Sequence, residues 1–348
     1  MKQIIKWGVI GSGGIANRRT IPEGIIKAEN TKLISVYDID IAVNHSVAKA
    51  YNALACDTID ELLASDIDAV YVASPANLHL EHVIMCANAN KHILCEKPIG
   101  ISVQESEKML KICEETGVIL GVGLMMRFHA QHQAALRLVE EGKLGKLVYG
   151  RAQLSCWYPP IEGAWRQDIK SGGGGSLMDM GSHCVDLLEM YFGKIKSLSC
   201  FTNNNIHPYS SEDSAVATFM FESGAIATVD SCFCIPDNSS KNILELYGSK
   251  GSIIAKNTIG QGESGEMIAY LEKNDTGYDA TQSRSVDNGI FISPAPINMY
   301  KSEIQEFNSA IRENRTPVNS ANIGFSNQLI IASCYEAANS KRIIEVDY

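Results

Sequence analysis

The 348-residue sequence lacks several features that mark particular classes of protein. It has no run of 18 apolar residues, so we expect no transmembrane helix and no membrane partner. Basic residues are too few for a nucleic-acid-binding protein, because 30 Lys and Arg stand against 40 Asp and Glu, which gives a net charge of −10. Internal repeats and low-complexity tails are also missing. With 45% hydrophobic and 20% charged residues, the composition is that of a folded globular protein.

Cysteine pairs at metal-binding spacing are missing as well. The ten cysteines are scattered and form no CxxC pair, and Cys232 and Cys234 have the spacing of alternate residues on a strand. We therefore expect reduced, mostly buried thiols, a cytoplasmic protein and no metal site. The first 14 residues run straight into a glycine loop without a cleavage site of small residues, which favours a first strand over a signal peptide.

The first third of the chain alternates short apolar runs with helical patterns. This alternation is typical of a doubly wound parallel sheet that is covered on both faces. Strands are predicted at 4–10, 33–38, 69–74, 92–98 and 118–123, with a short one near 53–57, and helices at 14–28, 42–51, 79–88 and 103–116.

The pattern changes after about Gly123, where apolar and polar residues begin to alternate along most strands. Such alternation indicates an antiparallel sheet with one face on a core. The segment 260–296 is predicted to be a long, partly mobile excursion. Strands are predicted at 148–158, 195–201, 214–221, 225–233, 243–248 and 252–256, and helices at 128–141, 176–191, 299–313 and 321–339.

The fold class is therefore expected to be α/β with two domains. A Rossmann domain would span residues 1–123. An α+β domain with a large, mainly antiparallel open sheet would span residues 124–348 and hold the substrate and the oligomer contacts.

A glycine-rich loop joins the first predicted strand to the first helix with the pattern GxGxxA. The first glycine permits a tight turn, the second lets the backbone approach a pyrophosphate, and the alanine lets helix and strand pack closely. The helix N-terminus then offers N–H donors and a positive dipole end to phosphates. The alternative is a glycine-rich turn without a ligand. The predicted cofactor-binding residues of this loop are Gly11, Ser12, Gly13, Gly14, Ile15 and Ala16.

Asp38 ends the second predicted strand, 22 residues after Ala16. An acidic residue there can accept hydrogen bonds from the ribose hydroxyls of the adenosine. Its charge would repel a 2′-phosphate, and the next residue is Ile39 rather than a basic residue that would clamp one. We therefore expect NAD, with NADP less favoured, although Arg18 and Arg19 lie close enough in sequence to weaken that preference.

Two further loops follow strands of the same sheet, where ligands of doubly wound folds bind. The loop after the third strong strand holds candidate cofactor contacts in Ser74, Pro75, Asn77 and His79, and His79 can equally be a helix-start residue without chemistry. The next strand ends in Glu96, Lys97 and Pro98, and Glu96 and Lys97 are further candidate cofactor contacts. A lysine beside a dinucleotide can polarise a substrate oxygen and pass a proton, although an exposed lysine is the default interpretation.

Four glycines, 172–175, open the helix predicted at 176–191. At about 100° per residue, Asp179, His183 and Asp186 fall within about 60° of one another on that helix. A histidine that shares a face with a carboxylate is suited to general-base work near neutral pH. The competing interpretation is a capped helix with a buried, hydrogen-bonded histidine.

Together these motifs resemble the glucose-fructose oxidoreductase / inositol dehydrogenase (Gfo/Idh/MocA) family over nearly the whole chain. The segments that carry the resemblance are GSGGIA (11–16), the SPxxxH loop (74–79), EKP (96–98), MRF (126–128), GKLGKL (142–147), WR (165–166), GGSLMDMGSHCVD (174–186) and YKSEIQEF (300–307). The family's GxNxRF segment has no Asn here, since the run is GLMMRF (123–128), which leaves the set of recognised hydroxyls open.

The resemblance implies catalytic positions at Lys97, Asp179 and His183. It further implies that substrate or nicotinamide is lined by Arg127, Trp165, Arg166 and Tyr300, together with Asp179 and His183. Two of these have plainer interpretations, because Arg127 can be a salt bridge at the domain boundary and Trp165 can be core packing.

The expected activity is transfer of a hydride between NAD and a secondary alcohol or ketone of a sugar or cyclitol. His183 would accept the hydroxyl proton, Asp179 would orient His183 or hold a neighbouring hydroxyl, and Lys97 would stabilise the alkoxide. The alternatives are an NAD-dependent glycosidase that oxidises its substrate transiently and a dinucleotide-binding regulator without catalysis. The resemblance also implies a homodimer or homotetramer. Direction, and whether the substrate carries a phosphate or carboxylate, stay open.

Overall fold

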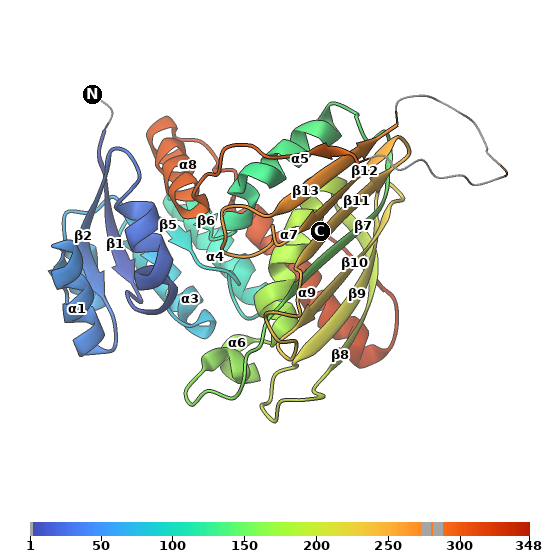
Figure 1. The fold of residues 1–348 in the computed structure, drawn as a ribbon. Coiled ribbons are helices and arrows are strands. Elements are labelled where there is room, and N and C mark those ends of the chain that lie inside the picture. The colour runs from blue at the N-terminus through green and yellow to red at the C-terminus, as the bar shows by residue number, and fades with distance from the viewer. Residues whose placement is uncertain (1–2, 273–279, 281–287) are drawn as a thin grey trace.

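Two β-sheets organise the chain, and Figure 1 shows them as separate lobes with helices packed on each. The computed structural model describes residues 3–272, 280 and 288–348. The expectation for 260–296 falls partly on residues 273–279 and 281–287, which lie outside the described residues. In the part of the chain that is described, no helix has the length and apolar character needed to cross a membrane.

The first sheet has six parallel strands in the order β3-β2-β1-β4-β5-β6. This is the order of a doubly wound dinucleotide-binding fold, so the predicted parallel sheet is confirmed. Its strands are β1 Ile5–Ile10, β2 Thr31–Tyr37, β3 Leu54–Ala55, β4 Ala69–Val72, β5 His92–Cys95 and β6 Leu120–Val122. Its helical segments are η1 Ala16–Ile25, α1 Ile41–Tyr51, α2 Ile59–Ala64, η2 Ala76–Leu78, α3 His79–Asn88 and α4 Val103–Thr116.

The second sheet has nine strands in the order β14-β13-β12-β11-β7-β10-β9-β8-β15. Neighbours are antiparallel except β7 and β10, which pair in parallel, so the mainly antiparallel sheet is confirmed as a mixed one. The strands are β7 Leu147–Ser155, β8 Ile195–Asn203, β9 Ser214–Phe221, β10 Ile226–Cys232, β11 Ile243–Gly248, β12 Gly251–Lys256, β13 Glu266–Leu271, β14 Ile290–Phe291 and β15 Ile344–Glu345.

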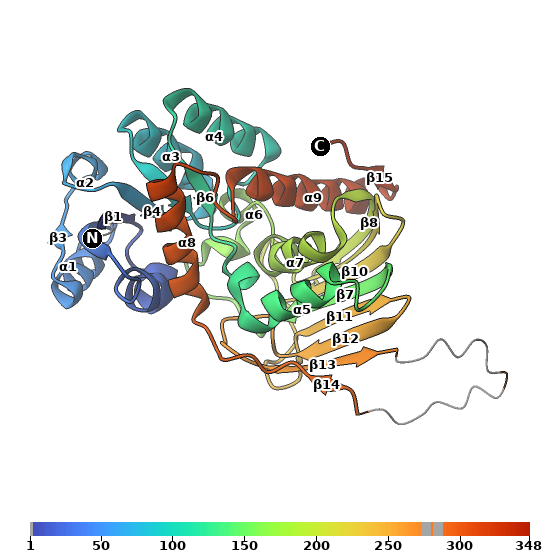
Figure 2. The same ribbon diagram turned by 90° about the horizontal axis from the view of Figure 1, so that it is seen from above.

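Three helices of this part of the chain pack on one face of the second sheet. Figure 2 shows α5, α7 and α9 on that face, and no helix of the described residues lies on the opposite face. The alternating burial of β9 follows from this one-sided cover. The helical segments of this part of the chain are η3 Met125–Phe128, α5 Ala130–Glu140, η4 Trp165–Gln167, α6 Ile169–Gly172, η5 Leu177–Gly181, α7 Ser182–Phe192, α8 Met299–Glu313 and α9 Ala321–Ser340.

Two sequence-based expectations are corrected by the described residues. The excursion predicted for 260–296 contains β13 and β14, because Met267 and Ala269 alternate with exposed residues and add a strand to the sheet edge. The helix predicted at 176–191 is not a uniform α-helix, since it begins as the π-helical turn η5 before α7. The assumed 100° per residue does not hold through such a turn.

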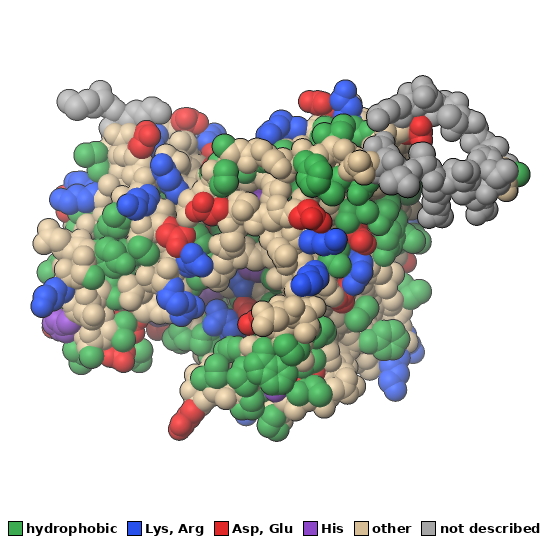
Figure 3. Space-filling model, viewed as in Figure 1, with side chains coloured by type: hydrophobic (Ala, Val, Ile, Leu, Met, Phe, Trp, Pro, Cys, Tyr) green, Lys and Arg blue, Asp and Glu red, His purple; other side chains and the backbone are tan. Residues whose placement is uncertain are grey.

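Helix α8 returns from the second half of the chain to pack on the first sheet (Figure 2). Phe307 of α8 is fully buried, and its ring centroid lies 5.6 Å from that of Trp7 on β1. The Trp7 indole donates a hydrogen bond of 3.0 Å to Asn308 of the same helix. The first lobe is therefore completed by residues from beyond the expected boundary at 123, and the hollow between the two lobes is visible in Figure 3.

We predict that Phe307→Ala lowers the free energy of unfolding by about 3–5 kcal/mol, because it leaves a cavity against Trp7. Urea titration followed by tryptophan fluorescence measures this change. Phe291→Ala is the matched control, since Phe291 is 64% exposed on β14 and its removal should change little. Equal losses in the two variants would contradict the packing role of α8.

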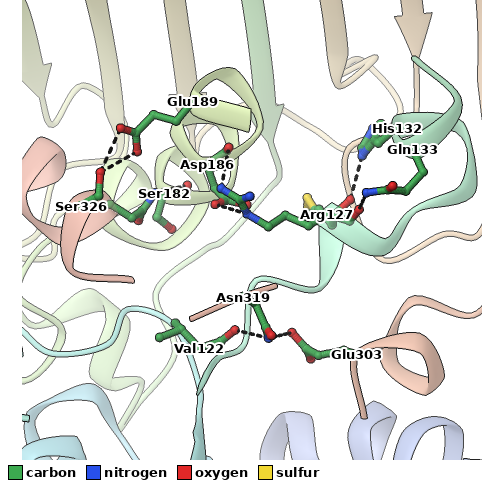
Figure 4. Close-up of polar contacts among 12 residues, drawn as sticks. Val122, Arg127, His132, Gln133, Ser182, Asp186, Glu189, Glu303, Asn319 and Ser326 are labelled. Atoms are coloured by element: carbon green, nitrogen blue, oxygen red, sulfur yellow. Dashed lines mark hydrogen bonds and ion pairs between the residues drawn. The ribbon is translucent and has the colours of Figure 1, made fainter. Parts of the chain in front are cut away.

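A carboxylate at the C-terminal end of α7 is held by groups that are distant in sequence. Glu189 accepts hydrogen bonds of 2.9 and 3.1 Å from the Ser326 hydroxyl of α9, and one of 2.8 Å from the Tyr348 hydroxyl (Figure 4 shows the Ser326 contact). Burial raises the pKa of Glu189 to about 7, although these hydrogen bonds oppose the rise. The folded chain thus holds a proton there more tightly than the unfolded chain does.

The raised pKa of Glu189 makes the stability of the fold depend on pH. Because the folded pKa of Glu189 lies above the unfolded value of about 4.3, stability falls as the pH rises toward 7. We predict that Glu189→Gln unfolds with a higher free energy than wild type at pH 8, by about 1 kcal/mol once partial exposure is allowed for. The two proteins should converge near pH 5. Denaturant titrations at both pH values test this, with the exposed Glu140→Gln as control, and a Gln variant that is no more stable at pH 8 contradicts it.

Candidate functional site

A cavity of about 450 Å³ opens between the two lobes, beyond the carboxyl ends of β4 and β5. Figure 3 shows the hollow, with basic, acidic and histidine side chains inside it. The first lobe and the second lobe both supply lining residues. Among them are Gly14, Ile15, Ser74, His79, Glu96 and Lys97 from the first, and Tyr158, Trp165, Arg166, Asp179, His183, Phe233 and Tyr300 from later in the chain.

The glycine loop has the backbone that the sequence motif requires. Gly11 has a φ of +78°, and a Cβ there would lie 2.7 Å from the backbone of Ala73 and Ser74, so only glycine fits. Gly14 has a φ of +44° and nothing within 4 Å of its Cβ position, which leaves open space where a ligand can approach the backbone. The hydroxyl of Ser12 is buried and has no hydrogen-bond partner within the described residues. These features fit a bound pyrophosphate.

Asp38 lies beside the loop, as the spacing predicts. One carboxylate oxygen accepts a 2.8 Å hydrogen bond from the Gly13 N–H, and the other accepts one of 3.0 Å from the Asp40 N–H. Each oxygen keeps a further lone pair that can accept a ribose hydroxyl. The carboxylate therefore shapes the loop and presents negative charge at the same place.

The loop after β4 is fixed by its own histidine. The two ring nitrogens of His79 lie 2.9 Å from the carbonyl oxygens of Pro98 and Ser74, and the side chain is 1% exposed. Burial lowers the pKa of His79 to about 4, although the backbone contacts oppose this. His79 thus lies between the loops that follow β4 and β5, and both of its ring nitrogens face backbone carbonyls. Pro75 and the exposed Asn77 lie in the same loop but do not line the cavity.

Lys97 and Asp179 meet across the two lobes. The Lys97 ammonium donates 2.7 Å hydrogen bonds to the Asp179 carboxylate (Oδ1) and to its backbone carbonyl. The Arg166 guanidinium donates to the same Oδ1 at 3.0 Å. Burial favours a raised pKa for Asp179, but the charges and hydrogen bonds of Lys97 and Arg166 outweigh it and hold the pKa well below its usual range. Asp179 is therefore ionised at neutral pH and partly neutralises both cations.

The remaining hydrogen-bonding capacity of this cluster faces the cavity. An ammonium has three donors and Lys97 uses two, so one N–H is left. Within the described residues Asp179 Oδ2 makes no hydrogen bond, and no bond joins Asp179 to His183. Of the two roles expected for Asp179, the contacts support holding a substrate hydroxyl and do not support orienting His183.

His183 lines the cavity from α7 and is 5% exposed. Burial and the nearby charge of Lys97 lower its pKa well below the usual value, although Asp179 opposes the shift, so the imidazole is neutral near pH 7. Its Nδ1 atom is buried without a partner among the described residues, as is the hydroxyl of Tyr300. Buried polar atoms are rarely left unpaired, and two of them at one cavity indicate that a ligand completes them.

Arg127 lies away from this cavity. Its Nε donates a 2.7 Å hydrogen bond to Asp186, both side chains are buried, and Figure 4 shows the pair beside α7. Arg127 and Asp186 are therefore joined to each other and are not among the residues that line the cavity, whereas their neighbours Met126 and His183 are. The contacts match the salt-bridge interpretation of Arg127. Asp186 lies one turn from His183 on α7, as predicted, but its carboxylate is bonded to Arg127.

Several lining residues were missed from the sequence. Tyr158 and Phe233 contact each other with tilted rings whose centroids lie 4.9 Å apart. Trp165, which was predicted, also lines the cavity, with the Arg166 guanidinium 4.2 Å from its ring centroid. Tyr158 and Phe233 stand near the ends of β7 and β10, where strand alternation alone does not show which residues line a cavity. Among the described residues, no group of three or more His, Cys, Asp and Glu is placed to hold a metal ion.

Comparison with known proteins agrees with this architecture. Residues 5–124 match the family model described as "Oxidoreductase family, NAD-binding Rossmann fold", and residues 132–254 match "GFO/IDH/MocA C-terminal domain". The 1,5-anhydro-D-fructose reductase of Ensifer adhaerens is 26% identical, with 90% of each chain covered. The 2,7-anhydro-N-acetylneuraminate hydratase of Escherichia coli K12 is 30% identical over 72% of this chain and 67% of its own.

Among solved structures, the aldose-aldose oxidoreductase of Caulobacter crescentus in complex with glycerol superposes with a TM-score of 0.88. It is 23% identical and covers 99% of this chain and 100% of its own, which shows a shared fold. The two family matches, the 30% identical relative and the doubly wound sheet agree with the glycine loop and the cavity motifs. The chain is therefore an oxidoreductase of the Gfo/Idh/MocA family, with an NAD-binding Rossmann fold in its N-terminal part.

Proposed function

We propose that this enzyme transfers a hydride between NAD(H) and a secondary alcohol or ketone of a sugar or cyclitol. The observation that carries the proposal is the meeting of Lys97 from the first lobe with Asp179 and Arg166 from the second, beside a neutral His183, in one cavity. The relative named as an anhydro-sugar reductase supports the substrate class. When bound, the nicotinamide supplies the chemistry of accepting or donating the hydride.

The residues of this chain bind the substrate, transfer its proton and stabilise the charge on its oxygen. His183, neutral at pH 7, accepts the proton of the substrate hydroxyl during oxidation and returns it during reduction. The free N–H of Lys97 binds the same oxygen and stabilises its developing negative charge. Asp179 Oδ2 accepts a neighbouring hydroxyl, and Tyr300 and the aromatic residues Tyr158, Trp165 and Phe233 exclude water and contact the apolar face of the ring.

The glycine loop and Asp38 would hold the dinucleotide. Gly11 to Ala16 offer backbone N–H groups to the pyrophosphate, and Asp38 accepts from the ribose. Ser74 and Glu96 stand at the carboxyl ends of β4 and β5, beside the nicotinamide half. We infer that NAD is preferred over NADP, since Asp38 would repel a 2′-phosphate.

Substitution of the two proton-handling residues tests the proposal. Wild type should reduce NAD with at least one member of a panel of inositols, aldoses and anhydro sugars. Lys97→Ala and His183→Ala should each lower kcat/KM by about 10²–10⁴-fold while NADH still binds. The exposed Lys143→Ala serves as control. Turnover that survives both substitutions would remove these residues from the mechanism.

Cofactor preference is tested separately at Asp38. Asp38→Ser keeps an acceptor for the Gly13 N–H but removes the charge, so the ratio of kcat/KM for NAD over NADP should fall by about tenfold or more. Asp40→Ser removes a carboxylate two residues away and keeps a cap for α1, and it should leave the ratio unchanged. An unchanged ratio in Asp38→Ser contradicts the assignment.

A second candidate reaction is favoured by the relative named as a hydratase. In an enzyme that oxidises its substrate transiently and then reduces it, the same groups operate without net redox. The two reactions differ in stoichiometry, because a dehydrogenase releases one NADH per turnover and the transient reaction releases none.

The third possibility, a dinucleotide-binding regulator, would bind NADH without turnover, and the free donor of Lys97 argues against it.

We further propose a homodimer or homotetramer that forms through the bare face of the second sheet. Val216 and Met220 of β9, Ile226 of β10 and Phe201 of β8 are 44–78% exposed there. Exposed apolar patches of this kind mark interaction surfaces. Light scattering gives the mass of the protein in solution, and the mass of a monomer would contradict the proposed homo-oligomer. A cytoplasmic location, consistent with ten free thiols, completes the proposal.

A further inference from the structure

A buried tyrosine lies behind Glu96, one of the residues that line the cavity, and does not line the cavity itself. Tyr71 of β4 is fully buried, and it is absent from the lining of the cavity. Its hydroxyl accepts a 2.9 Å hydrogen bond from the Thr20 hydroxyl of η1 and donates a short hydrogen bond to the Glu96 carboxylate. The other oxygen of Glu96 accepts the backbone N–H of Lys97 at 3.1 Å. A continuous chain of hydrogen bonds thus runs from η1 through two adjacent strands to Lys97.

Both oxygens of Glu96 are therefore engaged within the protein. A Cβ on Gly123, which follows β6, would lie 3.1 Å from the Glu96 carboxyl carbon, so the backbone there packs closely against Glu96. These hydrogen bonds restrain the Glu96 carboxylate. Glu96 also lines the cavity, so the cofactor contact that the sequence suggested for it stays a prediction.

We propose that Tyr71 is a positioning residue that keeps Glu96 ionised and thereby fixes the place and the electrostatic surroundings of Lys97. The proposal rests on the proposed hydride-transfer function, in which Lys97 binds the reacting oxygen. Tyr71 acts only through Glu96. The negative charge of Glu96 adds to that of Asp179, so that two anions offset the two cations Lys97 and Arg166.

The charged and titratable groups around Glu96 determine how it responds to pH. Burial raises the pKa of Glu96, and the Tyr71 hydrogen bond, Lys97 and Arg166 oppose the rise. Cys95 precedes it on β5, and α8 presents Tyr300 and the buried Glu303 toward it. Burial raises the pKa of Glu303 well above its usual value, and the proximity of Glu96 adds to the rise. Tyr71 is then the neutral donor on which the Glu96 charge depends most.

Removal of one hydroxyl tests this. Tyr71→Phe keeps the ring and leaves one Glu96 oxygen buried without a donor, which raises the pKa of Glu96 because a hydrogen bond to the charged form is lost. We expect the acidic limb of the kcat/KM profile to move upward by about one pH unit. In a Glu96→Gln background, Tyr71→Phe should cause no further shift, because no charge remains to be stabilised.

The matched control is Tyr191→Phe. Tyr191 is also a buried tyrosine, its hydroxyl donates a 3.1 Å hydrogen bond to the His132 carbonyl, and neither residue is among those that line the cavity. The Tyr191→Phe variant should lose a comparable free energy of unfolding, but the acidic limb of its kcat/KM profile should not move. Should Tyr71→Phe fold poorly, Thr20→Val removes the bond to the Tyr71 hydroxyl alone and should produce a smaller shift in the same direction. An unshifted profile in the folded variant, or an equal shift in Tyr191→Phe, overturns the proposal.

A titration without turnover separates this proposal from the proposed function. In protein labelled with ¹³C at the glutamate carboxyl, the difference between wild type and Glu96→Gln identifies the Glu96 signal. Its midpoint should rise by about one pH unit in Tyr71→Phe. If the midpoint rises but no polyol reduces NAD, the tyrosine–glutamate pair stands and the proposed function fails. If it does not move, the pair has no such role, whatever the activity.

Discussion

The ion cluster of Lys97, Asp179 and Arg166 is the interaction on which the site depends, because it joins the lobes where the cavity lies. Lys97 reaches across from the end of β5, and Asp179 stands in the π-helical turn that opens α7. Removing one partner from this partly buried cluster leaves an uncompensated charge beside the cavity, which is unfavourable. The two lobes are thus held in a fixed relation at the point where a substrate must be oriented.

The same cluster sets the charge of the cavity. Asp179 stays ionised because two cations face it, and His183 stays neutral because burial and Lys97 disfavour its protonated form. An ammonium donor and a neutral imidazole therefore stand together near pH 7, which is the pairing that alcohol oxidation and ketone reduction both require. Behind them, the half-buried Glu96 and the fully buried Tyr71 extend the hydrogen-bonded structure into the core of the first lobe.

The sequence predicts those parts of the structure that depend on local pattern. The apolar strands, the glycine loop and the carboxyl-end loops follow from periodicity and from residues that only certain backbones accept, and Gly11 is the clearest case. Helix α2 was missed, although Thr58 accepts from the Glu61 N–H as in a capping box, because six residues carry too little periodicity. Contacts distant in sequence were beyond reach. Arg127 forms an ion pair with Asp186, α8 packs on the first sheet, and Tyr71 donates a hydrogen bond to Glu96. Each of these contacts is decided by packing in three dimensions.

The central claim is that one substrate oxygen lies between the Lys97 ammonium and the His183 imidazole, next to the nicotinamide. A crystal structure of the enzyme with NADH and a polyol that it turns over measures this most directly. The account predicts an oxygen within about 3 Å of both nitrogens, on the carbon that faces the nicotinamide ring. A polyol that is bound with its reacting carbon away from either residue, or a dinucleotide outside the glycine loop, would contradict it.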